Sequence, residues 1–418
     1  MRDDTAALPV RRVVGALADA ARRWEHPDYP PRVRAQAALE RRTGFSAPVV
    51  EIALERLFAR LTREEIERTI AGDLGSLDVL DGVAPGPYGA PAHAAPAGTV
   101  LVISSNTTIG VALWPAALAL CCKNRVVLKE PEDALAAAFS ATLSEEEPAL
   151  RSALSAASWQ GGERALEDPL FAAADVAVVF GGDAALRAIR ARLPVAARFV
   201  GYGSAASAGI VLREALCDEA AAMRAADGAA LDLSLYESSG CLSLHALYAE
   251  RGGSVTPERF AALLAQALER RTVEFPVGSR DLAQRVAIRG ARERAAFRAA
   301  GGEGSVHAAA DLAWTIVVDP PRGEPPAFLP RTLAVAPVDD VRDAAERIAE
   351  LGVPVETLGV APPPSAQGPA GARLLALAAR VGASRLCALG EMQHPHLASH
   401  HGARPRCTEF VRWIDVEP

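Results

Sequence analysis

The chain has 418 residues, of which 50% are hydrophobic and 23% are charged, and its formal net charge is -7 at pH 7. This composition is typical of a globular protein that is long enough for two or three domains, or for two lobes that share one cleft. The mildly acidic balance argues against a general attraction for nucleic acid or for anionic membranes.

The sequence gives no sign of export or of membrane insertion. Met1 is followed by Arg2, Asp3 and Asp4 rather than by an apolar segment, so no signal peptide is expected. The longest strongly apolar run, 109–122, is too short to be a transmembrane segment. The six cysteines form no C-x-x-C pair and no disulfide framework, which favours a cytoplasmic location.

The first 98 residues divide into a helical part and an irregular part. Residues 1–80 show apolar positions at helical spacing, and the pair Thr62 and Glu65 is typical of a capping box that opens a helix. Residues 81–98 are rich in Gly, Pro and Ala, which predicts an irregular or edge segment rather than a core strand.

Residues 99–208 alternate between apolar strands and helices. Strands are predicted over 99–104, 126–129, 175–180 and 198–201, and helices over 108–122 and 133–145 and up to Arg192. This alternation predicts an α/β fold with a parallel, doubly wound sheet, which binds ligands at the carboxyl ends of its strands. Asn106, Lys129 and the pair Gly181-Gly182 all follow such strand ends.

Residues 209–384 repeat the α/β pattern and are expected to form a second lobe. Strands are predicted over 210–212, 314–318 and 332–336, and helices over 214–227, 256–270, 339–351 and 372–381. Residues 385–418 form a tail whose alternating stretch 410–416 predicts a strand. Such a terminal strand often pairs with a neighbouring subunit or lobe.

Cys241 is the candidate nucleophile of the second lobe. Leu231, Leu233 and Leu235 alternate with polar residues before it, which predicts a strand, and the apolar residues 242–247 after it predict a buried helix. A thiol at a strand-to-helix turn would be activated, because helix N-termini favour the thiolate. The alternative is a small buried core cysteine, and the local sequence leaves both open.

Lysine and asparagine are rare and clustered. The chain has two lysines, Lys123 and Lys129, and two asparagines, Asn106 and Asn124, although arginine and alanine are abundant. All four lie within 106–129. Either chemistry requires these residues in this segment, or the clustering is chance.

Several short motifs together resemble the aldehyde dehydrogenase superfamily, and more closely its bacterial fatty-acyl-CoA reductase branch of the LuxC type. Their order and spacing carry the resemblance over nearly the whole chain. The motifs are V-L-V-I-S-S-N-T (101–108), V-V-L-K-E-P-E-D (126–133), F-G-G-D (180–183), F-V-G-Y-G-S (199–204), S-S-G-C-L-S (238–243), L-G-E-M-Q-H-P (389–395) and F-V-R-W-I-D-V-E (410–417).

The resemblance implies a fold and a catalytic pair. The fold would be two parallel, doubly wound α/β lobes, with a helical N-terminus belonging to the cofactor lobe (99–208), a catalytic lobe (209–384) that carries Cys241, and a C-terminal oligomerisation strand. Cys241 would attack the thioester carbonyl of an acyl-CoA, releasing CoA and forming an acyl-enzyme. Asn106 and the backbone N–H of Cys241 would bind the oxyanion. Without the resemblance, Asn106 is more simply a turn residue at a strand end.

The resemblance also implies a nicotinamide cofactor. Lys129 matches the lysine that binds the adenosine ribose or a 2′-phosphate, and Glu132 stands where an acidic residue binds ribose hydroxyls. This leaves NADPH and NADH open, with NADPH slightly preferred by family analogy. The other cofactor-binding residues implied are Ser104, Gly181, Gly182 and Asp183.

Two departures from the superfamily pattern affect the expected chemistry. Aldehyde-oxidising members carry a glutamate as general base upstream of the cysteine, whereas residues 201–207 (G-Y-G-S-A-A-S) hold no carboxylate. A thioester reductase does not need to activate water, so this gap favours acyl-CoA chemistry. Pro326 and Ala327 stand where a glutamate would hold the nicotinamide ribose.

Further titratable residues lie near Cys241 and in the tail. Glu237 and His245 flank Cys241 and are candidate auxiliary residues, with His245 expected one turn along a helix, although a plain helix-surface or core histidine is the simpler interpretation. The tail carries His394, His396, His400 and His401, whose spacing is not that of a structural zinc site, so no metal is expected.

The sequence thus predicts an oxidoreductase that reduces an acyl-CoA, with long-chain acyl groups implied by the resemblance alone. The alternatives are a CoA-acylating dehydrogenase of short aldehydes, a catalytically weakened homologue that acts as a binding subunit, and a cysteine acyltransferase that uses no nicotinamide. A homo-oligomer is expected, and an acyl-activating synthetase or acyltransferase partner is plausible by analogy.

Overall fold

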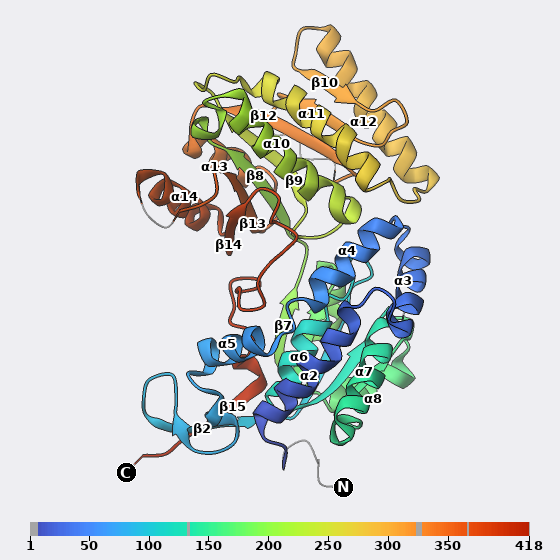
Figure 1. The fold of residues 1–418 in the computed structure, drawn as a ribbon, viewed down its shortest axis with the longest axis vertical. Helices are drawn as coiled ribbons and strands as arrows, with labels where there is room; N and C mark the ends of the chain where they lie inside the picture. The colour runs from blue at the N-terminus through green and yellow to red at the C-terminus, as the bar shows by residue number, and fades with distance from the viewer. Residues whose placement is uncertain (1–6, 132–133, 323–327, 366–367, 418) are drawn as a thin grey trace. The chain divides into compact units, whose positions relative to one another are not determined.

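The computed structural model describes residues 7–131, 134–322, 328–365 and 368–417. The chain folds into two compact units (Figure 1). The first unit comprises Met1–Thr43, Val50–Gly203 and His396–Pro418, and the second comprises Gly44–Val49 and Ser204–Pro395. Each unit is built around its own parallel sheet with helices on both faces, which confirms the predicted α/β class.

The first unit contains a five-stranded sheet in the order β5-β4-β3-β6-β7, and all four strand pairs are parallel. Its strands are β3 (Thr99–Ile103), β4 (Arg125–Lys129), β5 (Leu154–Ala157), β6 (Val176–Phe180) and β7 (Arg198–Tyr202). The connecting helices are α6 (Leu113–Cys121), α7 (Leu135–Glu146), α8 (Arg164–Ala172) and α9 (Asp183–Arg190). The strand order reverses between β3 and β6, so the crevice expected for a ligand lies outside their carboxyl ends.

The predicted helical N-terminus is confirmed and packs on the first sheet's helices. It consists of α2 (Val10–Glu25), α3 (Pro30–Thr43), α4 (Ala47–Phe58), α5 (Arg63–Leu74) and the short helix η1 (Leu77–Leu80). The fully buried Trp24 of α2 packs against Phe58 of α4, and Phe58 packs against Phe139 of α7. Thr62 caps α5 as expected, because its hydroxyl accepts the backbone N–H of Glu65.

The Gly/Pro-rich segment and the tail build a separate small sheet. β2 (Pro91–Pro96) lies between β1 (Ala84–Pro85) and β15 (Val411–Asp415), with antiparallel pairing on both sides. The predicted terminal strand therefore pairs with residues of its own unit. Its partner β2 is the central strand of this sheet rather than an edge segment.

The second unit contains a seven-stranded sheet in the order β10-β11-β12-β9-β8-β13-β14, in which only β10 runs antiparallel. The strands are β8 (Ala206–Val211), β9 (Leu244–Glu250), β10 (Ser305–Ala308), β11 (Thr315–Val318), β12 (Thr332–Val338), β13 (Val355–Ala361) and β14 (Arg385–Ala388). The helices are α10 (Glu219–Ser234), α11 (Pro257–Glu274), α12 (Leu282–Ala300), α13 (Val341–Ala349) and α14 (Gly368–Val381). Short helices are η2 (Pro148–Leu150) in the first unit, η3 (Arg213–Leu216) and η4 (Leu235–Ser238) in the second, and η5 (Thr408–Phe410) in the tail.

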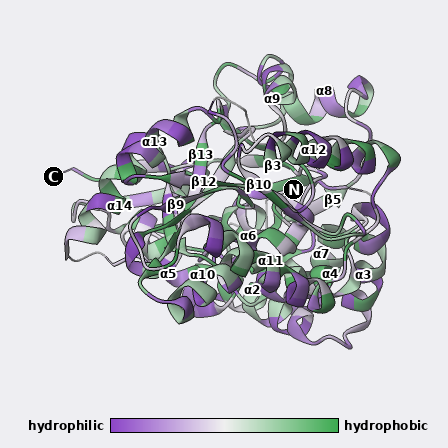
Figure 2. Cartoon of the chain, turned by 90° about the horizontal axis from the view of Figure 1, so that it is seen from above, coloured by the Kyte–Doolittle hydropathy of each residue, from purple (hydrophilic) through white to green (hydrophobic). Residues whose placement is uncertain are grey.

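Two apolar layers cover the second sheet. Leu233 of α10 and Phe260 of α11 belong to one cluster, and Ile348 of α13 and Leu374 of α14 belong to the other. Neighbouring residues of β8 point to opposite layers, since Ile210 belongs to the second cluster and Val211 to the first. The outward side of α13 is hydrophilic, as expected for a helix that buries one face (Figure 2).

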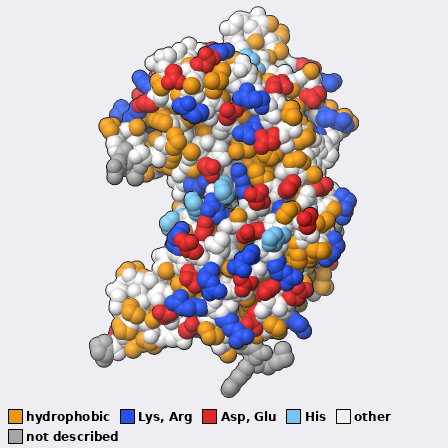
Figure 3. All heavy atoms as spheres, in the orientation of Figure 1, with side chains coloured by type: hydrophobic (Ala, Val, Ile, Leu, Met, Phe, Trp, Pro, Cys, Tyr) orange, Lys and Arg blue, Asp and Glu red, His pale blue; other side chains and the backbone are white. Residues whose placement is uncertain are grey.

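The surface view shows Lys and Arg side chains interspersed with Asp and Glu on the face drawn (Figure 3). That face therefore carries no broad field of one sign. No helix among the described residues combines the length and the apolar character needed to cross a membrane.

The local structure around Cys241 differs from the prediction. The leucines before it lie in α10 and η4, not in a strand, and the apolar residues after it form β9, not a helix. Cys241 therefore lies at a helix-to-strand turn. The alternating pattern of three leucines was misleading because the helix buries Leu233 and Leu235 completely within an apolar layer.

Candidate active site

A buried ion-pair cluster holds the chain just before Cys241. Glu237 accepts a hydrogen bond from Arg280 at 2.8 Å and forms an ion pair with Arg331, with 2.6 Å between the nearest nitrogen and oxygen, and all three side chains are almost fully buried. Arg280 also donates to the carbonyl oxygens of Leu312 and Ala313. Glu237, a predicted auxiliary residue, is therefore engaged by two arginines, and its observed contacts anchor the loop that carries Cys241.

The same segment has an unusual backbone. Tyr236, Glu237 and Ser238 follow one another with φ angles of 55°, 51° and 58°. Each non-glycine residue in the left-handed region costs on the order of 1 kcal/mol or more and persists only where its surroundings enforce it. The two arginines on Glu237 supply that enforcement, so the path of the chain into Cys241 is fixed by side-chain contacts rather than by local preference.

Ser207, at the start of β8, connects the Cys241 loop to the sheet. Its hydroxyl donates to the carbonyl oxygen of Cys241 at 2.7 Å and accepts the backbone N–H of Thr357 at 3.1 Å. Its own backbone N–H donates to Nδ1 of His245 at 3.2 Å. The three contacts place Cys241, His245 and β13 around one fully buried serine.

The L-G-E-M-Q-H-P stretch supports the loop from its other side. The fully buried carboxylate of Asp232 accepts the backbone N–H groups of Gly390 and Met392. The amide of Gln393 donates to the hydroxyl of Ser243 at 2.7 Å, and that hydroxyl accepts the N–H of Gly240. This motif, which the resemblance left without a role, thus braces both ends of the Cys241 turn.

The surroundings of Cys241 disfavour the thiolate form of its side chain. Burial, and next the negative charge of Glu356, raise the pKa of Cys241 to about 12, although hydrogen bonds from the backbone at Cys241 and Leu242 oppose this. The expected activation by a following helix is wrong, because β9 follows the cysteine and no helix begins there. If Cys241 is the nucleophile, as the sequence predicts, its proton would have to be removed during the reaction.

His245 lies on β9 and not on a helix. Burial lowers the pKa of His245 to about 4, partly opposed by hydrogen bonds to the backbone of Ser238 and Ser207. A backbone N–H can only donate, so Nδ1 is an acceptor and the neutral ring carries its proton on Nε2. The ring packs against Phe328 with 5.1 Å between centroids. His245 is thus a neutral residue whose ring is hydrogen-bonded to the backbone of Ser207 and Ser238.

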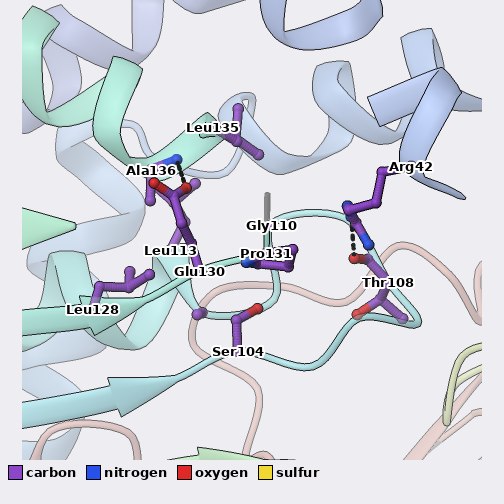
Figure 4. A pocket seen from close by; sticks show the side chains of 11 residues that line it. Arg42, Ser104, Thr108, Gly110, Leu113, Leu128, Glu130, Pro131, Leu135 and Ala136 are labelled. Atoms are coloured by element: carbon purple, nitrogen blue, oxygen red, sulfur yellow. Dashed lines mark hydrogen bonds between the residues drawn. The ribbon is translucent and has the colours of Figure 1, made fainter. Parts of the chain in front are cut away.

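The predicted oxyanion residue lies in the first unit, on the loop between β3 and α6. The Asn106 side chain is exposed, and Arg42 of α3 donates to the carbonyl oxygens of Asn106 and Thr108. Figure 4 shows Arg42 directed at Thr108 across a pocket that Ser104, Gly110 and Pro131 also line. At Gly110, with a φ of 66°, an added Cβ would lie 2.3 Å from Leu57, so only glycine fits this turn.

The carboxyl edge of the first sheet has features that fit a dinucleotide. The ammonium of Lys129 lies 5.6 Å from the ring centroid of Trp159, which follows β5. Gly182 precedes α9 at the end of β6, and an added Cβ there would meet no atom within 4 Å. Open space at a glycine beside a helix N-terminus suits a pyrophosphate. Asp183 opens α9, and its Oδ1 leaves no room for a Cβ at Gly203. Glu132 lies outside the described residues, as do Pro326 and Ala327.

Two of the four clustered Lys and Asn residues, Lys123 and Asn124, have structural roles. Lys123, with a φ of 62°, is buried and pairs with Asp81 at 2.6 Å. The amide of Asn124 is fully buried, where it donates to the carbonyl oxygens of Ala119, Cys122 and Phe410 and accepts the N–H of Gly98. The contacts of Lys123 and Asn124 explain their presence, so the hypothesis that chemistry requires all four residues does not extend to these two.

The tail histidines do not converge. His401 stacks on Tyr202 with 4.0 Å between centroids, and burial lowers its pKa to about 3. His394 contacts Glu391, and His396 lies 3.9 Å from Glu65. Among the described residues no group of three or more His, Cys, Asp or Glu is placed to hold a metal ion.

Ser207, Gln393, Glu356 and Trp159 were not predicted as site residues. Ser207 and Gln393 belong to stretches that the resemblance quoted or inspected, so a search for polar residues in otherwise apolar surroundings could have found them. Glu356 is the one charged residue in the mainly apolar run 353–361, a signal of the same kind. Trp159 gives no such signal, because its role depends on the pairing of β4 with β5.

Comparison with models of known protein families shows which family this chain belongs to. The model of the family described as acyl-CoA reductase (LuxC) matches residues 5–413. The chain belongs to the LuxC acyl-CoA reductase family. It is accordingly an oxidoreductase that acts on an aldehyde or an acyl-CoA, and the resemblance expected from its motifs is confirmed.

Solved structures agree on the fold of this LuxC family member. It is similar to an NAD-dependent benzaldehyde dehydrogenase from Corynebacterium glutamicum, with a TM-score of 0.70 and 16% identity over 99% of this chain and 87% of the other. It is also similar to an NADP-dependent glyceraldehyde-3-phosphate dehydrogenase from Bacillus halodurans, with a TM-score of 0.69 and 14% identity over 99% and 88%. These likenesses confirm an aldehyde-dehydrogenase-like fold. A search of curated proteins found no match.

Proposed function

We propose that this LuxC family member reduces an acyl-CoA thioester to the aldehyde through an acyl-enzyme on Cys241, with NADPH or NADH as reductant. The observation that carries the proposal is the placement of Cys241. It is a half-buried cysteine on a turn that a buried ion-pair cluster, Ser207 and Gln393 all hold in place. A cysteine of the apolar core would not require so many polar supports.

The residues of the chain would act in a defined order. Cys241 would attack the thioester carbonyl, the carbon–sulfur bond to CoA would break, and the proton of the cysteine would end on the departing CoA sulfur. Asn106 and the backbone N–H of Cys241 donate to the oxygen that becomes negative, and losing one such donor typically costs about 3–4 kcal/mol of transition-state stabilisation. A reduced nicotinamide, when bound, supplies the hydride. The thiohemiacetal on Cys241 then expels the aldehyde and restores the cysteine.

The first unit would hold the cofactor. Lys129 presents a point charge suited to a phosphate or to ribose hydroxyls, and Trp159 limits where its ammonium can lie. The backbone at Gly182 and Asp183 would take the pyrophosphate. The nicotinamide dependence named for the two similar dehydrogenases supports this part of the proposal. NADPH is slightly preferred, and long-chain acyl groups are the substrates that the family resemblance favours.

Oligomerisation is part of the same proposal. β15 forms one edge of its three-stranded sheet, and Arg412, Ile414 and Asp415 are exposed along it. A second copy of the chain could extend this sheet by pairing along that edge. An acyl-activating synthetase or an acyltransferase would be a chemically sensible supplier of the acyl group.

The test is turnover by purified protein with acyl-CoAs of graded chain length, NADPH or NADH, and Cys241→Ala alongside. Aldehyde formation that disappears in the variant supports the reductase and identifies both chain length and cofactor. Activity confined to short aldehydes with CoA would favour the acylating dehydrogenase instead. An acyl adduct on Cys241 without oxidation of either cofactor would favour an acyltransferase, and no adduct at all would favour a binding subunit.

A further inference from the structure

The loop between β3 and α6 carries Asn106, and the fold fixes both ends of this loop. At its start, the backbone N–H of Ser104 donates to the carbonyl oxygen of Lys129 at 2.9 Å. At its end, the φ of 66° and the close packing at Gly110 determine the turn that leads into α6. The residues between these points, 105–109, depend on other contacts to keep one conformation.

Residues 105–109 form no backbone-to-backbone hydrogen bond with any part of the chain that the structure describes. Arg42, in the last turn of α3, donates from Nη1 to the carbonyl oxygen of Asn106 at 2.6 Å and from Nη2 to that of Thr108 at 3.2 Å (Figure 4). The guanidinium is planar and rigid, so its two nitrogens cannot move independently. One side chain therefore fixes the carbonyl groups on both sides of Thr107.

The contact with Arg42 engages the backbone of Asn106 and leaves its side chain available. The Asn106 amide is exposed and has no hydrogen-bond partner among the residues that the structure describes. The hydroxyl of Ser105, by contrast, lies 3.4 Å from those of Thr107 and Thr108, within the loop itself. A residue with a fixed backbone and an unengaged amide suits a donor that has to reach a group outside its own loop.

Arg42 belongs to a packed helix, so its own position is determined independently of the loop. Leu39, one turn earlier in α3, is fully buried, and the hydroxyl of Thr43 donates to the carbonyl oxygen of Leu39 at 2.7 Å. A positive side chain in the last turn is also favoured by the helix dipole. Arg42 can therefore transmit the position of α3 to the backbone of Asn106.

We propose that Arg42 is a positioning residue for Asn106, and that it holds the loop so that the Asn106 amide donates to the oxyanion formed during acyl transfer. Arg42 does not touch the substrate in this role and acts through Asn106 alone. An oxyanion donor is effective because it is already in place when the charge develops. A misplacement of about 1 Å can cost on the order of 100-fold in rate. The inference rests on the proposed acyl-CoA chemistry of Cys241.

A double-mutant cycle tests whether Arg42 acts through Asn106. Acylation of Cys241 by a saturating acyl-CoA without cofactor is followed by quenched mass spectrometry in wild type, Arg42→Gln, Asn106→Ala and the double variant. Asn106→Ala should slow acylation by about 100-fold to 1,000-fold, because one oxyanion donor is lost. Arg42→Gln should slow it by about tenfold or more when Asn106 is present, and by less than about twofold in the Asn106→Ala protein.

Three controls separate positioning from structural support. Arg41→Gln removes the neighbouring, exposed arginine of α3 and should alter neither acylation nor the midpoint of urea unfolding. Arg42→Lys replaces the rigid fork by one flexible ammonium, so it should recover part of the lost rate when Asn106 is present and none in the Asn106→Ala protein. Iodoacetamide alkylates Cys241 without forming an oxyanion, so alkylation should proceed at the wild-type rate in every variant.

A slowing by Arg42→Gln that is just as large in the Asn106→Ala protein would overturn the inference, since Arg42 would then act on something other than Asn106. Acylation at the wild-type rate in Arg42→Gln or in Asn106→Ala would also overturn it, and both results leave the acyl-enzyme on Cys241 intact. An equal slowing of acylation and alkylation indicates a disturbed site and overturns it as well. If wild-type Cys241 accepts no acyl group from any thioester, the proposed function itself fails, and the role of Arg42 fails with it.

Discussion

The hydroxyl of Ser207 donates a 2.7 Å hydrogen bond to the carbonyl oxygen of Cys241. It also accepts the N–H of Thr357, so one buried side chain connects the turn of Cys241 to β8 and β13. The geometry of the candidate nucleophile thus depends on the sheet through a single hydroxyl.

Replacing Ser207 by alanine should lower both stability and acylation. The N–H of Thr357 would lose its partner in a buried place, which costs about 1–3 kcal/mol of the free energy of unfolding. Urea unfolding measures this. The control is Ser144→Ala, whose hydroxyl donates to a helix carbonyl, and it should stay within about 0.5 kcal/mol of wild type. Equal stability of the two variants would contradict the role given to Ser207.

Glu237→Gln should be strongly destabilising. The change leaves two buried arginines without their counter-charge, and breaking a buried ion pair in this way costs about 3–5 kcal/mol. The matched control is Glu214→Gln, which removes a carboxylate from the more exposed pair with Arg373 and should cost less than about 1 kcal/mol. A Glu237 variant as stable as the Glu214 variant would show that the cluster does not anchor the loop.

In the free protein, iodoacetamide should alkylate Cys241 slowly and Cys217 rapidly. With a pKa of about 12, very little of Cys241 is thiolate near neutral pH, whereas Cys217 is exposed. Limited treatment with iodoacetamide followed by peptide mass mapping should therefore find Cys217 modified first. The rate at Cys241 should rise about tenfold for each unit of pH. Faster labelling of Cys241 than of Cys217 at neutral pH would mean that the thiol is already activated.

His245 should make the second unit acid-sensitive. Its pKa falls from 6.5 to about 4 on folding, so above pH 6.5 both states are neutral and it contributes nothing. As the pH falls below 6.5 the unfolded chain binds a proton that the folded chain does not, so the free energy of unfolding falls, by about 2 kcal/mol near pH 5.

The measurement for His245 is urea unfolding near pH 7.5 and near pH 5. Asparagine at this position keeps an oxygen that can accept the N–H of Ser207, so His245→Asn should lose less stability on acidification than wild type, by about 2 kcal/mol. The control His26→Asn, at an exposed histidine, should lose as much stability on acidification as wild type does. An identical acid response in all three proteins would contradict the buried, neutral histidine.

Most of the alternation of strands and helices in the first unit was predictable, because the strands other than β5 are short, mainly apolar runs bounded by helix signals. Val176–Phe180, for example, is buried at every position. β5 was not predicted, because its sequence L-S-A-A has no apolar pattern and its existence depends on pairing with β4. The sequence around β5 gives no information about its pairing with β4, which lies further back in the chain.

The region of Cys241 was predicted as a candidate site, and the local structure predicted for it is wrong. The motif S-S-G-C-L-S pointed to the cysteine, but Leu233 and Leu235 fit an alternating strand as well as a buried helix end. The contacts that distinguish the two, Glu237 with Arg280 and Arg331, span up to 94 residues of sequence. Residues of the site that depend on such contacts, Ser207 and Glu356 among them, could not be assigned roles before the fold was known.

The most direct test of the account is a single-turnover experiment on Cys241. Wild-type protein is mixed with an acyl-CoA without cofactor, the peptide containing Cys241 is weighed, and NADPH or NADH is then added. The account predicts one acyl group on Cys241, absent in Cys241→Ala, and its disappearance with release of one equivalent of aldehyde when the cofactor is added. An acyl group on another residue, or an adduct on Cys241 that neither cofactor removes as aldehyde, would contradict it.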